Sequence, residues 1–506
     1  MKKQRFERAL LISLGIFVVA GAVLLGGVHP AVQLALSGAA LVLLLVAVSW
    51  RFRKRGAFSV GAPFWVFLAL AAVCLVQLLW LPEGLLRWIQ PRGAALVAYS
   101  TEGLGPLWHR CLSLDPPGTA LDCCKLLGFA ALAATAALLV RDPPRALLLF
   151  WTISIAGMVV AAAAAFQVLA GGKTIFGIYR PEGGHRFVAP IVNENHAGAF
   201  YAALAFLHLG LALQLREPRR RWSMVAFTAL PALLVIASAS RGAIAALALG
   251  ALAMLVGQWR VGKINGRQLG YGIAITLILG TVALPASENV RREFGSKTTV
   301  ETVQEDVKVK LWADALPMAK DYPITGIGRG AFRSVFPSYY HVSSGLRVTY
   351  SHAENLLVQL LVELGPVVFG VLLCLVIWLA LRYFRRVPPT EAATIALLPV
   401  GVLLAQNLVD FNLEFPGTGF LLVVLLGALA GLHRGRTRHA QKRRRRVLAA
   451  SGWLAFVAAS GLALATLGAA GVRYDLRREG QELQAEINRG DKPEQTLRAT
   501  REAIRR

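Results

Sequence analysis

Long apolar stretches separated by short polar segments run along the chain. Thirteen stretches approach the length that crosses a bilayer: 9–28, 31–50, 61–81, 121–140, 146–170, 194–215, 223–240, 242–258, 268–285, 355–381, 391–409, 417–432 and 447–472. A helix needs about 20 apolar residues to cross the hydrocarbon layer. The pattern predicts an all-α integral membrane protein of about 12–14 transmembrane helices. A large loop is expected between the helices near 268–285 and 355–381.

The composition agrees with this class. Hydrophobic residues make up 56% of the 506 residues and charged residues only 16%, whereas soluble domains carry about 25% charged residues. The net charge of +26 would suggest a nucleic-acid partner in a soluble protein. Here most Lys and Arg lie in short segments between apolar stretches, so membrane topology accounts for them and no nucleic acid is expected.

The basic segments also predict an orientation. With the N-terminus in the cytoplasm, every connection on that side is basic: "RFRKRG", "RDPPR", "REPRRR", "WRVGKINGR", "LRYFRRVPP" and "HRGRTRHAQKRRRR". This is the positive-inside pattern. The outer side then receives 82–120, 171–193, "SASRG", 286–352, 410–417 and the tail after 473. These segments carry most of the candidate chemistry, and no nucleotide-binding motif occurs anywhere in the chain.

Four regions follow from this pattern. Residues 1–170 form N-terminal transmembrane helices, and 171–432 form a core that includes the outer loop 286–352. Residues 433–472 contain a basic cytoplasmic loop and the last transmembrane helix, and 473–506 form an amphipathic tail. Cys111 and Cys123 or Cys124 lie on or beside one outer loop, where a disulfide is one alternative and free thiols the other. No cluster of metal ligands is apparent.

The stretch "SHAENLLVQLLVELG" raises the first candidate site. His352, Asn355, Gln359 and Glu363 are three, four and four residues apart, a spacing that puts them on one helical stripe. Such polar residues can simply bond to neighbouring helices, and Ser351 could cap the helix. Ionisable groups in membrane helices more often mark a functional site, and His352 can take up a proton near neutral pH. Glu363 is expected to line the cavity or to pair with another span.

Two outer segments before the large loop carry basic or amide side chains. Arg241 lies in "SASRG" between two spans, and its guanidinium is a bidentate donor suited to phosphate. "YRPEGGHRFVAPIVNENHAGAF" contains Arg180, Arg186, Asn193 and Asn195, which suit an anionic, hydroxyl-rich ligand, although its asparagines could also serve as helix caps.

The large outer loop and the last short outer loop add further candidates. "KVKLWADALPMAKDYPITGIGRGAF" adds Lys308 and Lys310, and its glycines either form a simple turn or bring backbone N–H groups to a phosphate or sugar. "QNLVDFNLEFPG" adds Asp410 and Asn412, which suit sugar hydroxyls.

The ordered set of motifs resembles the O-antigen ligase and polymerase superfamily of bacterial envelope proteins. The similar features are "NENHAG", "SASRG", the Trp and "GIGRGAF" of the large loop, "HAENLLVQLLVELG" and "DFN", which together cover roughly residues 170–430. The resemblance implies a glycosyltransferase of lipopolysaccharide biosynthesis in the bacterial inner membrane, with a periplasmic site. Its donor would be a glycan linked to undecaprenyl diphosphate, and its acceptor lipid A–core or a growing polysaccharide.

The resemblance also implies roles for individual residues. His352 corresponds to the proposed catalytic base, and Arg241 to the arginine that binds the donor diphosphate, with no metal or other cofactor. The family has a second arginine just before the Trp of the large loop, where this chain has Lys308 and Lys310. Lys keeps the charge without the bidentate fork, so either a Lys suffices or Arg180 or Arg186 supplies the second clamp. Asn193, Asn195, Asn355, Asp410 and Asn412 complete the expected substrate-binding set.

Several functions share this scaffold. Transfer of a complete glycan to an acceptor, as in O-antigen ligases, is the leading hypothesis. A polymerase of O-antigen, capsule or exopolysaccharide and an oligosaccharyltransferase acting on protein hydroxyls are the alternatives within the superfamily. A transporter is the alternative from another class, although the chain has no evident internal repeat of the kind that many transporters show.

Overall fold

A computed structural model describes residues 2–53, 60–100, 111–172, 174–177, 179, 189–286, 300–341, 350–386 and 391–436. Within these ranges the regular structure is helical, and the only strand-like pairings are two isolated bridges, Trp80 with Cys111 and Ile175 with Tyr179. The expectation of an all-α protein is confirmed.

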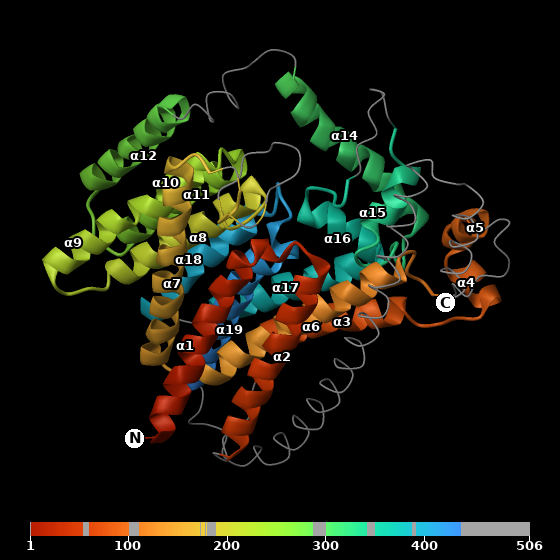
Figure 1. The fold of residues 1–506 in the computed structure, drawn as a ribbon, viewed down its shortest axis with the longest axis horizontal. Helices are drawn as coiled ribbons and strands as arrows, with labels where there is room; N and C mark the ends of the chain where they lie inside the picture. The colour runs from red at the N-terminus through yellow and green to blue at the C-terminus, as the bar shows by residue number, and fades with distance from the viewer. Residues whose placement is uncertain are drawn as a thin grey trace.

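The helices follow one another along the whole of the described chain (Figure 1). Their bounds are α1 Lys2–Val23, α2 Pro30–Arg53, α3 Ala62–Gln77, α4 Glu83–Ile89, α5 Pro91–Ser100, α6 Pro116–Leu139, α7 Pro143–Leu169, α8 Glu194–Ala212, α9 Pro218–Phe227, α10 Ala229–Ala237, α11 Arg241–Arg260, α12 Gly266–Ala286, α14 Val300–Asp321, α15 Phe332–Val335, α16 Leu356–Leu364, α17 Pro366–Arg386, α18 Glu391–Gln406 and α19 Pro416–Arg436. Short 3-10 turns η1 (Leu25–Gly27), η3 (Phe336–Ser338) and η4 (Asn412–Glu414) link some of them.

Eight helices in the described part of the chain are long and apolar enough to cross a membrane, and α3 and α18 are shorter apolar helices. Each of the twelve apolar windows that lie before residue 437 contains a helix. The thirteenth window, 447–472, and the tail after 473 lie outside the described residues. The chain is therefore a multi-pass integral membrane protein, as its hydropathy predicts.

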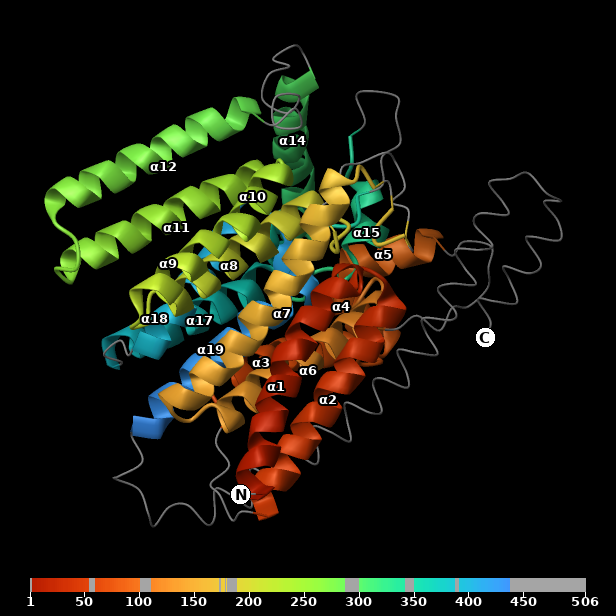
Figure 2. The same cartoon turned by 60° about the vertical axis from the view of Figure 1, so that its left-hand side comes forward.

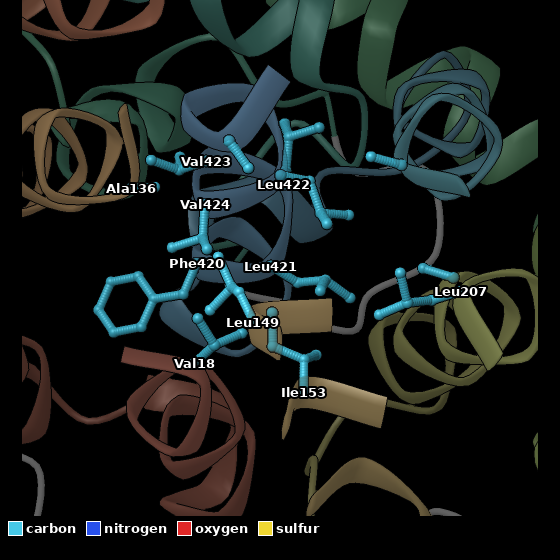
Figure 3. Packing of buried hydrophobic residues seen from close by; sticks show 14 of the residues in the cluster. Val18, Ala136, Leu149, Ile153, Leu207, Phe420, Leu421, Leu422, Val423 and Val424 are labelled. Atoms are coloured by element: carbon cyan, nitrogen blue, oxygen red, sulfur yellow. The ribbon is translucent and has the colours of Figure 1, made fainter. Parts of the chain in front are cut away.

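Helices α6 and α19 lie at the centre of the bundle, where α6 is 94% buried and α19 is 83% buried over their apolar stretches. Small residues bring the two helices close together: a Cβ added at Gly427 would lie 2.5 Å from the carbonyl oxygen of Ala133. Lipid provides no hydrophobic drive for helix association, so such close packing is what holds membrane helices together. In Figure 3, side chains of α19 from Phe420 to Val424 lie among residues of α1, α6, α7 and α8.

Helix α17 has the opposite character. None of the residues of its Pro366–Tyr383 stretch is buried within the protein, and Val371, Ile377 and Trp378 are about half exposed or more. An apolar helix face left open on a membrane bundle is a face suited to lipid, because acyl chains are as apolar as the side chains they meet.

The two ends of the bundle differ as the topology predicts. At one end, Glu7 near the start of α1 accepts a hydrogen bond from Arg141, 2.5 Å away, and pairs with Arg145 at 3.2 Å. The predicted inner segments at the N-terminus and at 141–145 therefore lie on the same side. Figure 2 shows α14 and α15 of the large loop at the end opposite the N-terminus. The assignment of these ends to cytoplasm and periplasm stays a prediction.

Candidate functional site

His352 lies in the loop just before α16 and is not part of the helix. The helix begins at Leu356, and Asn355 is its N-cap, with Oδ1 accepting from the N–H groups of Leu357 and Val358. The prediction of a Ser351 cap and of a continuous stripe from His352 is therefore wrong. Glu354 has a φ of +51°, a left-handed conformation that ends any helical path at this point. Only Gln359 and Glu363 share a face of α16.

Two phenylalanines hold the His352 ring. The imidazole stacks on Phe411, with ring centroids 4.8 Å apart and planes 21° apart. It meets the edge of Phe415 at 5.3 Å. His352 Nδ1 also lies 3.0 Å from the hydroxyl of Ser351, at hydrogen-bond distance. The half-buried ring is thus held between Phe411 and Phe415.

This environment changes the acidity of the imidazole. Burial lowers the pKa of His352 from 6.5 to about 4, because desolvation disfavours the charged form. Among the nearby charged groups, Glu414 and Asp122 oppose the shift, whereas Lys125 and His196 add to it. The ring is therefore neutral at physiological pH, as a general base must be.

The backbone next to His352 is held from two directions. The indole N–H of Trp312, on α14 of the large loop, donates to the carbonyl oxygen of Ala353 at 2.9 Å. The Ala353 N–H donates to Gln359 Oε1, on α16, at 2.7 Å. The tryptophan of the large loop and the histidine, which the sequence separates by forty residues, therefore form one local structure.

The segment 406–412 lies against the start of α16. Asn355 Nδ2 donates to the carbonyl oxygen of Leu408, and the Leu356 N–H donates to that of Asp410. Asp410 and Asn412 are buried, and Asn412 also contacts Asn407 at 3.0 Å. Sequence analysis proposed Asp410 and Asn412 as sugar ligands. In the structure their side chains bond within the protein and shape the 406–412 segment, so ligand contact by either stays a prediction.

The start of α8 meets the same segment. Asn193 caps the helix through its Oδ1, and Gln406 Nε2 donates to the carbonyl oxygen of Asn195. His196 Nε2 lies 3.7 Å from Asp410 Oδ1. His196 is 3% exposed, and its ring nitrogens have no hydrogen-bond partner among the described residues. Asn193 therefore supports the helix start through its side chain and Asn195 contacts Gln406 through its backbone, and the structure adds a buried histidine beside the predicted aspartate.

Arg241 is the first residue of α11, where the Ser240 hydroxyl accepts from the Ala243 N–H. The next residue, Gly242, faces the end of α18: a Cβ added there would lie 3.3 Å from Val409 Cγ2. Gly242, the residue after Arg241, and the ring of His352 thus both adjoin the segment 406–411.

The four remaining cations differ in position. Lys308 Nζ lies 3.2 Å from Glu354 Oε2, two residues from His352. Lys310 is exposed on α14. Arg180 and Arg186 lie outside the described residues. Of the two lysines that stand in the place of the family arginine, only Lys308 borders the loop of His352.

A buried cluster of five charges, which the sequence analysis missed, lies beneath this site. Arg329 lies 2.7 Å from Asp122, 2.5 Å from Glu363 and 2.6 Å from Glu414. Lys125 lies 2.7 Å from Asp122 and 2.9 Å from Glu414. Glu363 was expected to line the cavity or to pair with another span, and in the structure it pairs with Arg329 of the large loop. A charged residue within a glycine-rich turn was the one signal in the sequence that could have indicated Arg329.

These charges reinforce one another's ionisation. Burial alone would raise the pKa of Glu414, but the nearby charges of Arg329 and Lys125 outweigh burial and hold that pKa below its ordinary value. The three carboxylates in turn raise the pKa of Arg329, although burial opposes them. Glu414 and Arg329 are thus each held in the charged form by the opposite charges beside them.

The glycines of "GIGRGAF" serve the packing of this turn. Gly326 has a φ of +64°, and a Cβ there would lie 2.2 Å from the carbonyl oxygen of Glu363. The Ile327 and Gly328 N–H groups donate to the carbonyl oxygens of Val362 and Glu363. Of the two interpretations of these glycines, the tight turn describes the structure, and it docks the large loop onto α16.

The cysteines and potential metal ligands add little to the site. All five cysteines are free thiols, so the alternative of a Cys111 disulfide is not realised in this structure. Among the described residues no three His, Cys, Asp or Glu side chains are grouped as metal ligands.

Together, the fold and this site define a multi-pass membrane protein whose large loop docks on the bundle beside a neutral histidine. Residues 224–373 match the family model described as O-antigen ligase. The matched segment runs from α9 into α17 and contains Arg241, Lys308, Arg329 and His352. This match, over 150 of the 506 residues, supports the similarity to the O-antigen ligase-related superfamily that the motifs predict, a superfamily of O-antigen ligase- and polymerase-type membrane glycosyltransferases. No curated protein matches the chain.

Proposed function

We propose that the protein transfers a glycan from undecaprenyl diphosphate to an acceptor hydroxyl on the periplasmic face of the bacterial inner membrane. The observation that carries this proposal is that the start of α11, which contains Arg241, and the ring of His352 both meet the segment 406–411. Phe411 stacks on His352, and the start of α11 packs on Val409. A fixed cation and a neutral imidazole are the two groups that this transfer requires.

Arg241 would bind the diphosphate of the donor. Two phosphates that leave as an anion need a cation aimed at the charge that develops in the transition state. The guanidinium supplies a planar pair of donors that stays charged at any physiological pH. Lys308 would supply the second cation, since it pairs with Glu354 beside His352 and is partly exposed. Diphosphate binding would then compete with Glu354 for the lysine.

His352 would act as the general base. When Nδ1–H donates to the Ser351 hydroxyl, Nε2 carries the lone pair. Nε2 takes the proton of the acceptor hydroxyl as its oxygen bonds to the anomeric carbon, and the bond from that carbon to the diphosphate oxygen breaks. Undecaprenyl diphosphate leaves with the bonding electron pair, stabilised by Arg241 and Lys308, and no metal ion takes part in the proposed step.

The test uses purified full-length protein in lipid nanodiscs with an undecaprenyl-diphosphate-linked glycan and several acceptors. His352→Ala and Arg241→Ala are expected to abolish transfer. The matched controls are His341→Ala, an exposed histidine of the same large loop, and Arg260→Ala, at the other end of α11. Full transfer by either site variant would overturn the proposed roles.

The products of the wild-type reaction distinguish the related functions. Glycan on lipid A–core identifies a ligase, longer lipid-linked chains identify a polymerase, and glycan on a protein hydroxyl identifies an oligosaccharyltransferase. If no glycan is transferred to any acceptor and solute flux survives both site substitutions, the protein is a transporter and not a glycosyltransferase.

A further inference from the structure

Arg329 is buried in a way that stability alone does not explain. Its side chain is 2% exposed, and it shares the interior with Lys125, Asp122, Glu363 and Glu414. Desolvation of a buried ion pair can exceed its electrostatic gain, and apolar replacements are often no less stable. A five-charge cluster with a formal charge of −1 is therefore costly for the fold. Two sets of contacts connect this cluster to the surroundings of His352.

The first route follows α16. Arg329 NH1 lies 2.5 Å from Glu363 Oε2, and Glu363 Oε1 accepts from Gln359 Nε2 at 2.5 Å. Gln359 Oε1 in turn accepts from the Ala353 N–H at 2.7 Å. Three consecutive hydrogen bonds thus connect the guanidinium to the backbone of the residue that follows His352.

The second route reaches the aromatic wall. Arg329 NH2 lies 2.6 Å from Glu414 Oε2, which Lys125 also binds at 2.9 Å. Glu414 directly precedes Phe415, whose ring meets the imidazole of His352 edge-on at 5.3 Å. The same guanidinium therefore holds the Phe415 side of the imidazole through NH2 and Glu414, and the Ala353 backbone through NH1, Glu363 and Gln359.

We propose that Arg329 is a positioning residue for His352, an inference that rests on the proposed role of His352 as base. Arg329 is enclosed by protein, so it acts through Glu363 and Glu414 and has no contact with substrate. The forked guanidinium matters, because its two terminal nitrogens reach two carboxylates at once, whereas a lysine offers one nitrogen. Catalysis is sensitive to such support: a misplacement of about 1 Å can cost about 100-fold in rate.

The first experiment compares Arg329→Lys, Arg329→Gln and Gln359→Met with wild type, using full-length protein. Gln359→Met removes the last two hydrogen bonds of the first route and leaves all five charged residues in place, so it serves if an Arg329 variant fails to fold. Arg333→Gln, an exposed arginine four residues further along the same loop, is the matched control. We expect kcat to fall by up to about 100-fold in Arg329→Gln and Gln359→Met, with the KM for donor unchanged.

The second experiment follows the imidazole itself. Diethyl pyrocarbonate modifies accessible neutral histidines, and mass spectrometry gives the rate for each. We expect His352 to react several-fold faster in Arg329→Gln and Gln359→Met, with Arg329→Lys between these variants and wild type. Exposed His341 is the internal reference and should keep its rate. Wild-type reactivity and kcat in Gln359→Met, or in a folded Arg329→Gln, would overturn the proposal.

The two experiments separate this inference from the proposed function. If no glycan transfer is found with any acceptor, the reactivity of His352 still shows whether Arg329 holds the ring. If transfer occurs and depends on His352, but the reactivity of His352 is the same in every variant, only the positioning role falls.

Discussion

The imidazole of His352 lies parallel to the ring of Phe411, with centroids 4.8 Å apart and an angle of 21° between their planes. This contact removes water from one face of the base. The pKa of His352 is accordingly lowered to about 4, chiefly by burial. A histidine with a lowered pKa stays neutral over a wider pH range, so the base remains competent in mildly acid conditions.

The first prediction concerns the pH dependence of transfer. Because the neutral imidazole is the active form, kcat/KM should hold constant as pH falls through 6.5 and decline only toward pH 4. Phe411→Ala should move this acid limb back up toward 6.5, since water then reaches the ring. Initial rates at subsaturating donor across the pH range test both points.

The same shift has a consequence for stability. Between pH 4 and 6.5 the unfolded chain binds a proton at His352 that the folded protein does not. Its contribution to stability is therefore present above 6.5 and is lost as pH falls through this window. An acid limb near 6.5 in the wild-type enzyme would contradict the lowered pKa of His352.

A second prediction separates the two lysines of the large loop. Lys308 pairs with Glu354 beside His352, whereas Lys310 is exposed on α14. Lys308→Ala should raise the KM for the donor about 10-fold, the effect of losing roughly 1.4 kcal/mol of binding. Lys310→Ala should leave the KM nearly unchanged. Steady-state kinetics with the lipid-linked donor make the comparison, and equal effects of the two substitutions would exclude a specific role for Lys308.

A third prediction concerns the buried charges. Lys125→Met removes one of the two cations that Asp122 and Glu414 share and leaves only Arg329 beside them, and loss of a buried partner costs about 3–5 kcal/mol. The unfolding temperature in detergent should fall clearly. Arg220→Met breaks an exposed pair with Glu217, which is worth at most about 1 kcal/mol. Similar unfolding temperatures for the two variants would mean that the buried cluster contributes little to stability.

A fourth prediction concerns the glycine turn of the large loop. Gly326→Ala would force a Cβ into the carbonyl group of Glu363, 2.2 Å away, at a φ of +64°. The turn should separate from α16, and limited proteolysis should cleave the large loop faster. Gly84→Ala is the control, because an added Cβ there meets no atom within 4 Å. Equal protease resistance of both variants would refute the docking role of the turn.

The hydrophobic pattern was enough to predict the class of fold. A span is a local property, because about 20 consecutive apolar residues satisfy the membrane without reference to the rest of the chain. The basic segments predicted which connections share a side, and the contact of Glu7 with Arg141 agrees with that. The predicted start of the helix at His352 was wrong, because a helical spacing of polar residues does not reveal that Glu354 has a left-handed backbone.

The candidate site was predicted in part. The motifs indicated His352 and Arg241, since imidazole and guanidinium carry their chemistry in the residue type. They did not indicate Arg329, because the glycines on either side of it already accounted for the segment as a turn. Asn355 was expected to contact substrate, yet it caps a helix. An amide side chain suits both roles, and only its neighbours distinguish them.

By itself, the sequence determined that the chain spans a membrane many times, and it predicts which ends of the spans share a side and which residues have the chemistry for the proposed reaction. The tertiary structure alone decided the partners of those residues. Arg329 meets Glu414 across 85 residues, and Lys125 meets Glu414 across 289. The physical reason is that hydropathy and helix propensity act over one or two turns, whereas a buried charge is stabilised by whichever opposite charge the packing of distant helices brings within about 4 Å.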